Sequence, residues 1–221
     1  MGSSTLLSAL TTETLQEIAD LFQIQRKWLE GTTDTIYDCH YYYCYKNPWK
    51  FFKDLETLKI DAFDRPMVAF SSFSKFDNKS NKDQPILLVQ REKCADLDDK
   101  PVYRYRIIDQ FLWGYFKTRI QLKAMIHIWY KKYEIPVNIY QVDKKVLEGM
   151  EAGKIVPDSY IRNSKQLRNI GLEDFSLSFE DDRLAKETGE LGDVIEYIKA
   201  YKLEKMDGED PKTSFDTAKY R

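Results

Sequence analysis

A regularly spaced row of basic side chains lies in a stretch with helical character near the middle of the chain. Arg119, Lys123, His127 and Lys131 recur every four residues, which puts them on one face of a helix. Such a face could contact nucleic-acid phosphates or hold an anionic ligand, and His127 would add pH sensitivity. The alternative is a solvated face neutralised by the acidic end of the chain, because residues 172–211 carry thirteen acidic and five basic side chains.

Two cysteines and a histidine lie close together in a tyrosine-rich segment. Cys39, His40 and Cys44 could supply metal ligands, with Cys94 or His127 completing a set of four. Structural zinc sites usually combine two closely spaced ligand pairs, and only one such cysteine pair is present here. Buried cysteines packed among tyrosines are the simpler interpretation, and we expect neither a metal nor a cofactor.

Few residues are available for catalysis. His40 and His127 are the only histidines, and the motifs G-x-S-x-G, G-x-G-x-x-G and the P-loop are absent. Asp143-Lys144-Lys145 resembles the carboxylate-x-lysine element of PD-(D/E)xK nucleases, which implies a metal ion beside a phosphate-contacting lysine, with Asp109 as the second acid. No Pro-Asp precedes it at suitable spacing, and an N-cap at Asp143 explains the same residues. We predict no catalytic residues, with a metal-dependent nuclease kept as an alternative.

Composition and cysteine usage restrict the class of protein. The chain has 221 residues, 43% hydrophobic and 32% charged, enough for one sizeable domain with a small appendage. Its formal net charge of −2 provides no global field that would draw the molecule onto nucleic acid. The cysteines are odd in number, and no secretory signal or run of roughly 18 to 20 apolar residues is present. We therefore predict a cytoplasmic protein.

Helices are predicted in the first third of the chain. Two short helices are expected within residues 5–29, with Thr12 as the N-cap of the first, a tight break at Gln23, and Gly31 terminating the second. Residues 36–46, with alternating tyrosines, predict a strand or an extended linker. Asn47-Pro48 is typical of a helix start.

The middle of the chain predicts an antiparallel meander. Apolar segments at 66–73, 85–91 and 102–108 are separated by polar segments at 77–83 and 96–100. Asp109 is the expected N-cap of a long helix that extends to about Tyr133 and is kinked near Gly114. A fourth strand is expected at 136–142, then a helix from Asp143 to Gly153, and a last helix around residues 194–198.

This order of elements predicts the α+β class. We expect a short N-terminal helical segment followed by an antiparallel sheet with helices packed on one face, a layout similar to PAS and GAF sensor domains. The predicted units are a helical segment (1–34), an α+β regulatory domain (35–205) and a polar tail (206–221).

The N-terminal helices carry a resemblance to a known family. Residues 13–31, through Ile18-Ala19 and Trp28-Leu29-Glu30-Gly31, resemble the closing helices of XRE (Cro/CI-type) helix-turn-helix domains. The resemblance covers about nineteen of the 221 residues. In that family these helices complete the DNA-binding bundle, and the base-reading helix lies earlier in the chain.

A second alignment treats the same residues as the helix-turn-helix itself. Gln25, Arg26 and Lys27 then begin the recognition helix. In this alignment Gln23 stands where the turn prefers glycine, and Thr32 where an apolar anchor is expected. Two amphipathic helices that simply pack are the alternative. On each interpretation we expect Trp28 and Leu29 to be buried.

The resemblance implies a transcriptional regulator of the XRE type, seen mainly as its C-terminal sensing domain. We expect a homodimer that binds DNA through an N-terminal domain incomplete in this sequence, that senses a small-molecule or protein effector, and that has no membrane partner. The alternative from another class is a protein–protein interaction module, such as an antirepressor or defence-system component, without DNA contact. The expected ligand contacts are Tyr103, Tyr105, Trp113, Arg119, Lys123, His127 and Trp129.

Overall fold

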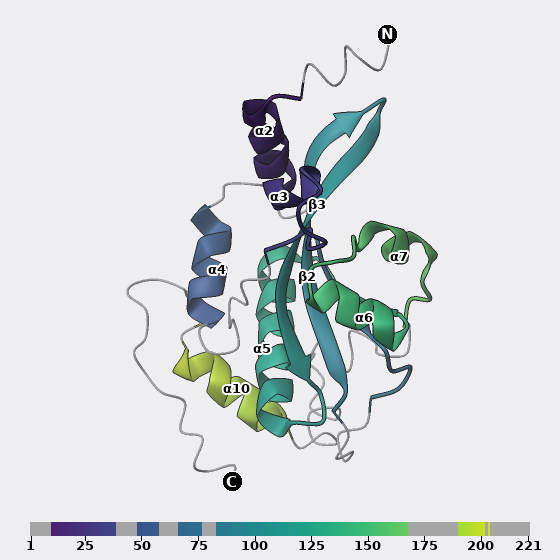
Figure 1. Ribbon diagram of the computed structural model, residues 1–221. Coiled ribbons are helices and arrows are strands. Elements are labelled where there is room, and N and C mark those ends of the chain that lie inside the picture. Colours follow the sequence, from purple (N-terminus) through teal and green to yellow (C-terminus); the bar gives the residue numbers. More distant parts are fainter. Residues whose placement is uncertain are drawn as a thin grey trace.

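The structure, a computed structural model, describes residues 10–38, 48–57, 66–76, 83–167, 190–201 and 203. Its class is α+β, as predicted, with a four-stranded sheet packed between helices (Figure 1). The described elements are, in chain order, α2 (Thr12–Phe22), α3 (Arg26–Leu29), α4 (Pro48–Thr57), β1 (Met67–Ser71), β2 (Pro85–Leu97), β3 (Lys100–Leu112), α5 (Phe116–Tyr133), β4 (Asn138–Gln141), α6 (Lys144–Glu151), α7 (Asp158–Asn163) and α10 (Leu191–Ala200).

The sheet has the strand order β3-β2-β1-β4. The predicted meander is confirmed, because β2 pairs antiparallel with both β1 and β3. The fourth strand is confirmed as well, but β4 pairs parallel with β1, so the sheet is mixed and not wholly antiparallel. A parallel pair needs a crossover connection, and the long helix α5 lies in it.

The hairpin of β2 and β3 is longer than predicted. Both strands continue through the polar residues up to a two-residue turn at Asp98 and Asp99, whose φ angles are 48° and 60°. Two consecutive residues with positive φ match the tightest hairpin turn, and aspartate tolerates that conformation. The polar stretch that predicted a loop therefore forms the tip of a ribbon.

The start of the long helix differs from the prediction. Asp109 does not cap it, since this residue lies within β3 opposite Leu88. Its carboxylate accepts a hydrogen bond from the Gln110 backbone N–H. Pairing with β2 thus overrides the local capping signal, and α5 begins at Phe116, after Gly114. It ends at Tyr133 as predicted, followed by Glu134 in the left-handed region at φ 56°.

Helices cover both faces of the sheet, not one. On one face the core joins the sheet to α5, α4 and α10. On the other face the core joins the sheet to α6 and to the segment around Ile36 and Tyr37, with side chains of α7 packed against it. Figure 1 shows α6 and α7 on the opposite side of the sheet from α4, α5 and α10. All five residues of β1 are buried, because a central strand covered on both sides needs a continuous apolar run.

The first two helices follow the predicted pattern, with two differences. The break at Gln23 and the stop at Gly31 are confirmed, and both residues have positive φ, at 53° and 70°. The N-cap is Thr11, whose hydroxyl accepts from the Thr14 N–H, and not Thr12. The prediction that Trp28 is buried is wrong, because its side chain is 37% exposed. Leu29 is half-buried.

Trp28 stays exposed because the helix pair contacts the sheet at another place. The C-terminal end of α2 rests on two arginines of β3: Arg104 Nη1 donates to the Leu21 carbonyl at 3.2 Å, and Arg106 Nη2 to Gln23 Oε1 at 3.3 Å. Arg104 is also ion-paired with the buried Glu92, at 2.8 Å. A polar contact at the end of α2 leaves the single-turn helix α3 uncovered.

Other predicted elements agree where they are described. The helix at Pro48, the helix α6 followed by Gly153 at φ 69°, and the last helix α10 are confirmed. Of the predicted strand 36–46, residues 36–38 form no strand and the remainder lies outside the described residues. The tail 206–221 also lies outside them.

Gln90 on β2 provides a test of the core. Its side chain is 1% exposed, and within the described part of the chain neither polar atom of its amide has a hydrogen-bond partner. A buried polar group without partners costs about 1–3 kcal/mol. We therefore expect Gln90→Met, which keeps the volume, to raise the free energy of unfolding by about 1–2 kcal/mol in urea titrations. A loss of stability would contradict this assignment.

Candidate functional site

The seven residues predicted to contact a ligand do not form one site. Tyr103 and Tyr105 belong with the core on the α6 side of the sheet. Trp113 and Trp129 belong with the core on the α5 side. Arg119, Lys123 and His127 are buried in α5. The sheet therefore separates two groups, and each has its own partners.

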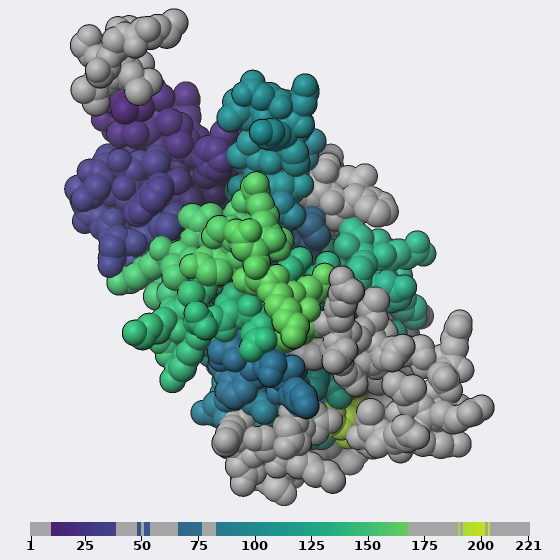
Figure 2. Space-filling model, turned by 90° about the vertical axis from the view of Figure 1, so that its right-hand side faces the viewer, coloured from purple at the N-terminus to yellow at the C-terminus, as the bar shows by residue number. Residues whose placement is uncertain are grey.

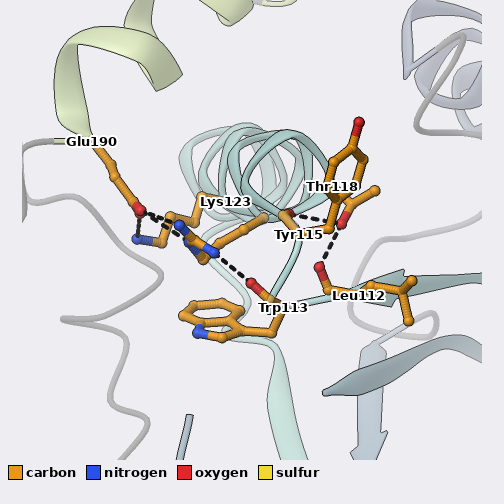
Figure 3. Close-up of polar contacts among 7 residues, drawn as sticks. Leu112, Trp113, Tyr115, Thr118, Lys123 and Glu190 are labelled. Carbon is orange, nitrogen blue, oxygen red and sulfur yellow. Dashed lines mark hydrogen bonds and ion pairs between the residues drawn. The ribbon is translucent and has the colours of Figure 1, made fainter. Parts of the chain in front are cut away.

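The α5 group is organised around a buried carboxylate (Figure 3). Glu190, which directly precedes α10, accepts hydrogen bonds from Arg119 Nη2 at 2.6 Å and from Lys123 Nζ at 2.5 Å. Arg119 Nη1 also donates to the Trp113 carbonyl at 2.5 Å. The side chains of Arg119, Lys123 and Glu190 are only 4%, 3% and 9% exposed.

This arrangement bears on whether the basic row holds an external anion or is neutralised by the acidic end of the chain. Burial alone would raise the pKa of Glu190, but the hydrogen bonds from Arg119 and Lys123 outweigh it and hold the pKa below its ordinary value of 4.5. Glu190 comes from the acidic part of the chain, so that part neutralises two members of the row, as the alternative interpretation predicted. The neutralisation takes place inside the protein and not on a solvated face.

The aromatic residues on this face pack as core. Trp129 is 1% exposed, and its ring lies 4.6 Å from that of Tyr133. Trp113 lies 5.3 Å from Phe76, ring centroid to centroid. Apolar residues of α5, Ile120, Leu122, Met125 and Ile126, pack between the sheet and α10. These contacts hold α5 between two layers.

The tyrosines on the other face join the hairpin to α7. The Tyr105 hydroxyl donates to Asp158 Oδ1 at 2.5 Å, and the Arg91 guanidinium lies 3.5 Å from the centre of the Tyr103 ring. Arg162 is also ion-paired with Asp158. Burial, followed by the hydrogen bond to Asp158, raises the pKa of the Tyr105 hydroxyl above its ordinary value, so it stays protonated and acts as a donor.

A cleft opens where the parallel strands β1 and β4 end. It consists of two hollows of about 530 and 680 Å³ that share Ser164 and Lys165. The residues after β1, blue in Figure 2, lie next to α6 and α7, green in the same view. The first hollow is lined by Ser72, Phe73, Gln141, Val142, Asp143, Lys144, Val146 and Tyr160, and the second by Ser74, Tyr140, Ile161, Arg162, Gln166 and Leu167.

The lining suits a small polar molecule. Serine hydroxyls and the amides of Gln141 and Gln166 offer hydrogen bonds. The charged lining residues are Lys144, Lys165, Arg162 and Asp143; of these, Arg162 is ion-paired with Asp158 and Lys144 with Glu148. Tyr140, Tyr160 and Phe73 add flat apolar surface. Ligands of sheets with crossover helices commonly bind outside the carboxyl ends of the strands, which is the location here.

Sequence reasoning missed this cleft. The sequence did contain a signal for it. The fourth predicted strand, 136–142, follows a long helix, which indicates a crossover connection and therefore a parallel pair of strands whose carboxyl ends lie together. The predicted antiparallel sheet has no such place. The residues that line the cleft also come from three separate parts of the chain, 72–74, 140–146 and 160–167.

The three residues predicted to contact DNA lie at the start of α3. Gln25 is its N-cap, and its backbone N–H donates to the Ile36 carbonyl at 2.7 Å. Arg26 is ion-paired with Glu30 at 2.9 Å and keeps 38% of its side chain exposed. Lys27 is exposed. Arg26 and Lys27 therefore present charge to solvent, on a helix of four residues.

In the nuclease alternative, Asp109 cannot serve as the second acid. Asp143 is the N-cap of α6, after β4, although its side chain makes no capping hydrogen bond. Asp109 lies on β3, at the opposite edge of the sheet. Strands lie about 4.8 Å apart, so β3 and β4 are separated by about 14 Å. The two carboxylates cannot share a metal ion.

Metal ligation finds no support in the described part of the chain, where no three His, Cys, Asp or Glu side chains gather. Cys39, His40 and Cys44 lie outside it. Cys94 is a free, half-buried thiol whose pKa is raised by burial, and its Sγ lies 3.4 Å from the Val102 carbonyl.

Comparison with known proteins gives no relative. No family model, curated protein or solved structure matches the chain. Among the described helices none has the length and apolar character to cross a bilayer.

Proposed function

We propose that this chain is a cytoplasmic transcriptional regulator of the XRE type, consisting mainly of its effector-sensing domain. The observation that carries the proposal is the geometry of α2 and α3. The first helix ends at Gln23 in the left-handed conformation, and the second begins at Arg26. A turn of three residues between two helices is typical of a helix-turn-helix unit, and Gln23 adopts the left-handed conformation at that turn without glycine.

The exposure of the helix pair supports the same proposal. Of its apolar residues only Ala19 is buried, whereas Leu15, Ile18 and Phe22 are half-buried and Leu21 is 42% exposed. A helix pair that forms its own finished core would bury these side chains. Half-exposed apolar positions suit a helix-turn-helix unit whose apolar side is completed by further packing in the proposed homodimer.

The cleft supplies the sensing part of the proposal. Its volume and its mixed polar and aromatic lining fit a small polar molecule. Binding there would favour one arrangement of a homodimer and so set the spacing of two DNA-binding halves. The α5 residues predicted to contact a ligand do not line this cleft.

DNA selection tests the proposal. The purified full chain is incubated with a random duplex library, and we expect enrichment of one sequence motif. The double variant Arg26→Ala with Lys27→Ala should bind that motif with an affinity at least about tenfold lower, because it removes positive charge from the start of α3. Lys131→Ala with Lys132→Ala, which removes the same charge from the far end of α5, is the matched control. Failure to enrich any motif would reject the proposal.

A second candidate is a protein-binding module without DNA contact. Leu10 and Leu21 on the α2 side are each 42% exposed, Trp28 on α3 is 37% exposed, and Leu97 at the hairpin tip is 66% exposed. Exposed large apolar side chains are enriched where proteins bind one another. If the DNA selection enriches no motif, that result favours this second function.

A further inference from the structure

The helix α6 lies between the cleft and residues 34–37, the segment that follows the N-terminal helix pair. Its first turn forms part of the cleft wall through Asp143, Lys144 and Val146. Its eight residues span about 12 Å. At the other end lies Gly153, where the N-terminal segment is attached. One short rigid element therefore connects two parts of the molecule that the proposed function assigns to sensing and to DNA.

The attachment at Gly153 consists of backbone hydrogen bonds. The Gly153 carbonyl accepts from the Ile36 N–H at 2.8 Å and from the Tyr37 N–H at 3.0 Å. The Lys154 ammonium, one residue on, is ion-paired with Asp34 at 2.6 Å. These contacts fix residues 34–37 to the C-terminal end of α6.

The same segment holds the turn between α2 and α3. The Ile36 carbonyl accepts from the Gln25 N–H at 2.7 Å, and the Tyr37 carbonyl accepts from Gln25 Nε2 at 3.4 Å. Gln25 is the N-cap of α3. The hydrogen bonds thus run without interruption from the end of α6 to the start of α3.

Packing makes this connection stiff. Leu147 and Met150 of α6 are 2% and 0% exposed and share a core with Ile36 and Tyr37. Close-packed cores shift as units and do not deform continuously. By contrast, α2 itself rests on the sheet through the polar contacts of Arg104 and Arg106. Hydrogen bonds of this kind contribute only about 0.5–1.5 kcal/mol each, because water competes for the same partners.

We propose that α6 transmits occupancy of the cleft to the α2–α3 helix pair: a group that displaces the first turn of α6 moves residues 34–37 and with them the start of α3. The proposal rests on the cleft being the effector site of the proposed function. It names the element whose position an effector changes.

Hydrogen exchange of the full chain tests this coupling. Val146→Trp fills the cleft from α6, and Lys144→Trp does so from a side chain that is 80% exposed and so carries little risk to folding. We expect each variant to change the exchange rate of the Gln25, Ile36 and Tyr37 amides by about fivefold or more. Ser74→Trp is the matched control: it fills only the second hollow, whose lining includes no residue of α6, and it should leave these amides unchanged.

The outcomes separate the coupling from the proposed function. Exchange in α10 and β1 reports global stability, and it should be unchanged in Lys144→Trp. If both α6 variants alter exchange within α6 but leave residues 25–37 unchanged, the coupling is wrong, whatever the DNA selection gives. If residues 25–37 respond while no DNA motif is enriched, the coupling stands and the proposed function is wrong.

Discussion

Glu190→Gln is expected to lower the free energy of unfolding by about 3–5 kcal/mol. The substitution keeps the shape of the side chain and removes its charge, which leaves the Arg119 guanidinium and the Lys123 ammonium buried without an anion among their described partners. Burying an unpaired charge is among the most costly changes in a protein interior. Urea denaturation at neutral pH measures the loss.

Two controls define the origin of this effect. Glu30→Gln breaks the exposed Arg26–Glu30 pair and should cost at most about 0.5 kcal/mol, because solvent screens that pair. Replacing Arg119, Lys123 and Glu190 together by methionine should restore most of the stability, since it removes both the charges and their desolvation. An effect of Glu190→Gln as small as that of Glu30→Gln would contradict the buried ion triad.

The same carboxylate predicts a pH dependence. The pKa of Glu190 in the folded protein lies below its ordinary value of 4.5. The contribution of Glu190 to the free energy of unfolding is therefore complete above about pH 4.5, and it is lost as the pH falls through the pKa of Glu190 in the folded protein. The difference in stability between the natural chain and Glu190→Gln should be largest at neutral pH and should shrink at acid pH, where both side chains are uncharged.

The second large effect is expected for Trp129→Ala, which should lower the free energy of unfolding by about 3–5 kcal/mol. Trp129 is the largest of the fully buried side chains, and its removal leaves a cavity between the sheet, α5 and α10. Trp28→Ala is the matched control, because Trp28 is 37% exposed and its loss should cost less than about 1 kcal/mol. Thermal unfolding followed by circular dichroism compares the two variants. Equal losses would mean that α3 is packed more tightly than its exposure indicates.

Much of the fold could be predicted from local signals. The pattern of apolar segments and polar turns fixed three antiparallel strands, and Pro48, Gly31 and Gly153 marked helix boundaries where the structure has them. Each of these signals acts within a few residues. The errors came where distant residues compete with a local preference. Asp109 is a good N-cap by type, but pairing of β3 with Leu88 on β2 places it in a strand.

The site was harder to predict, because its residues meet only through the topology. The basic row on α5 is typical of a surface feature, and nothing nearby in the sequence indicates that Arg119 and Lys123 are buried against Glu190, 67 residues after Lys123. For Trp28 the error was the opposite one. Its motif is typical of a packed helix and predicted burial, but the contacts of α2 with Arg104 and Arg106 leave Trp28 exposed. The cleft required the parallel pairing of β4 with β1, which can be inferred only from the order of the elements and not from any single segment.

The parallel pairing of β1 and β4 also determines the order in which the chain can fold. The β2–β3 hairpin closes over a two-residue turn, so its contacts are local and can form within microseconds. Val68 must instead find Asn138, about 70 residues away, and closing so long a loop carries a large entropic penalty before any contact compensates for it. We expect the ribbon to be the earliest ordered part of the chain, and the edge that forms the cleft to be among the last.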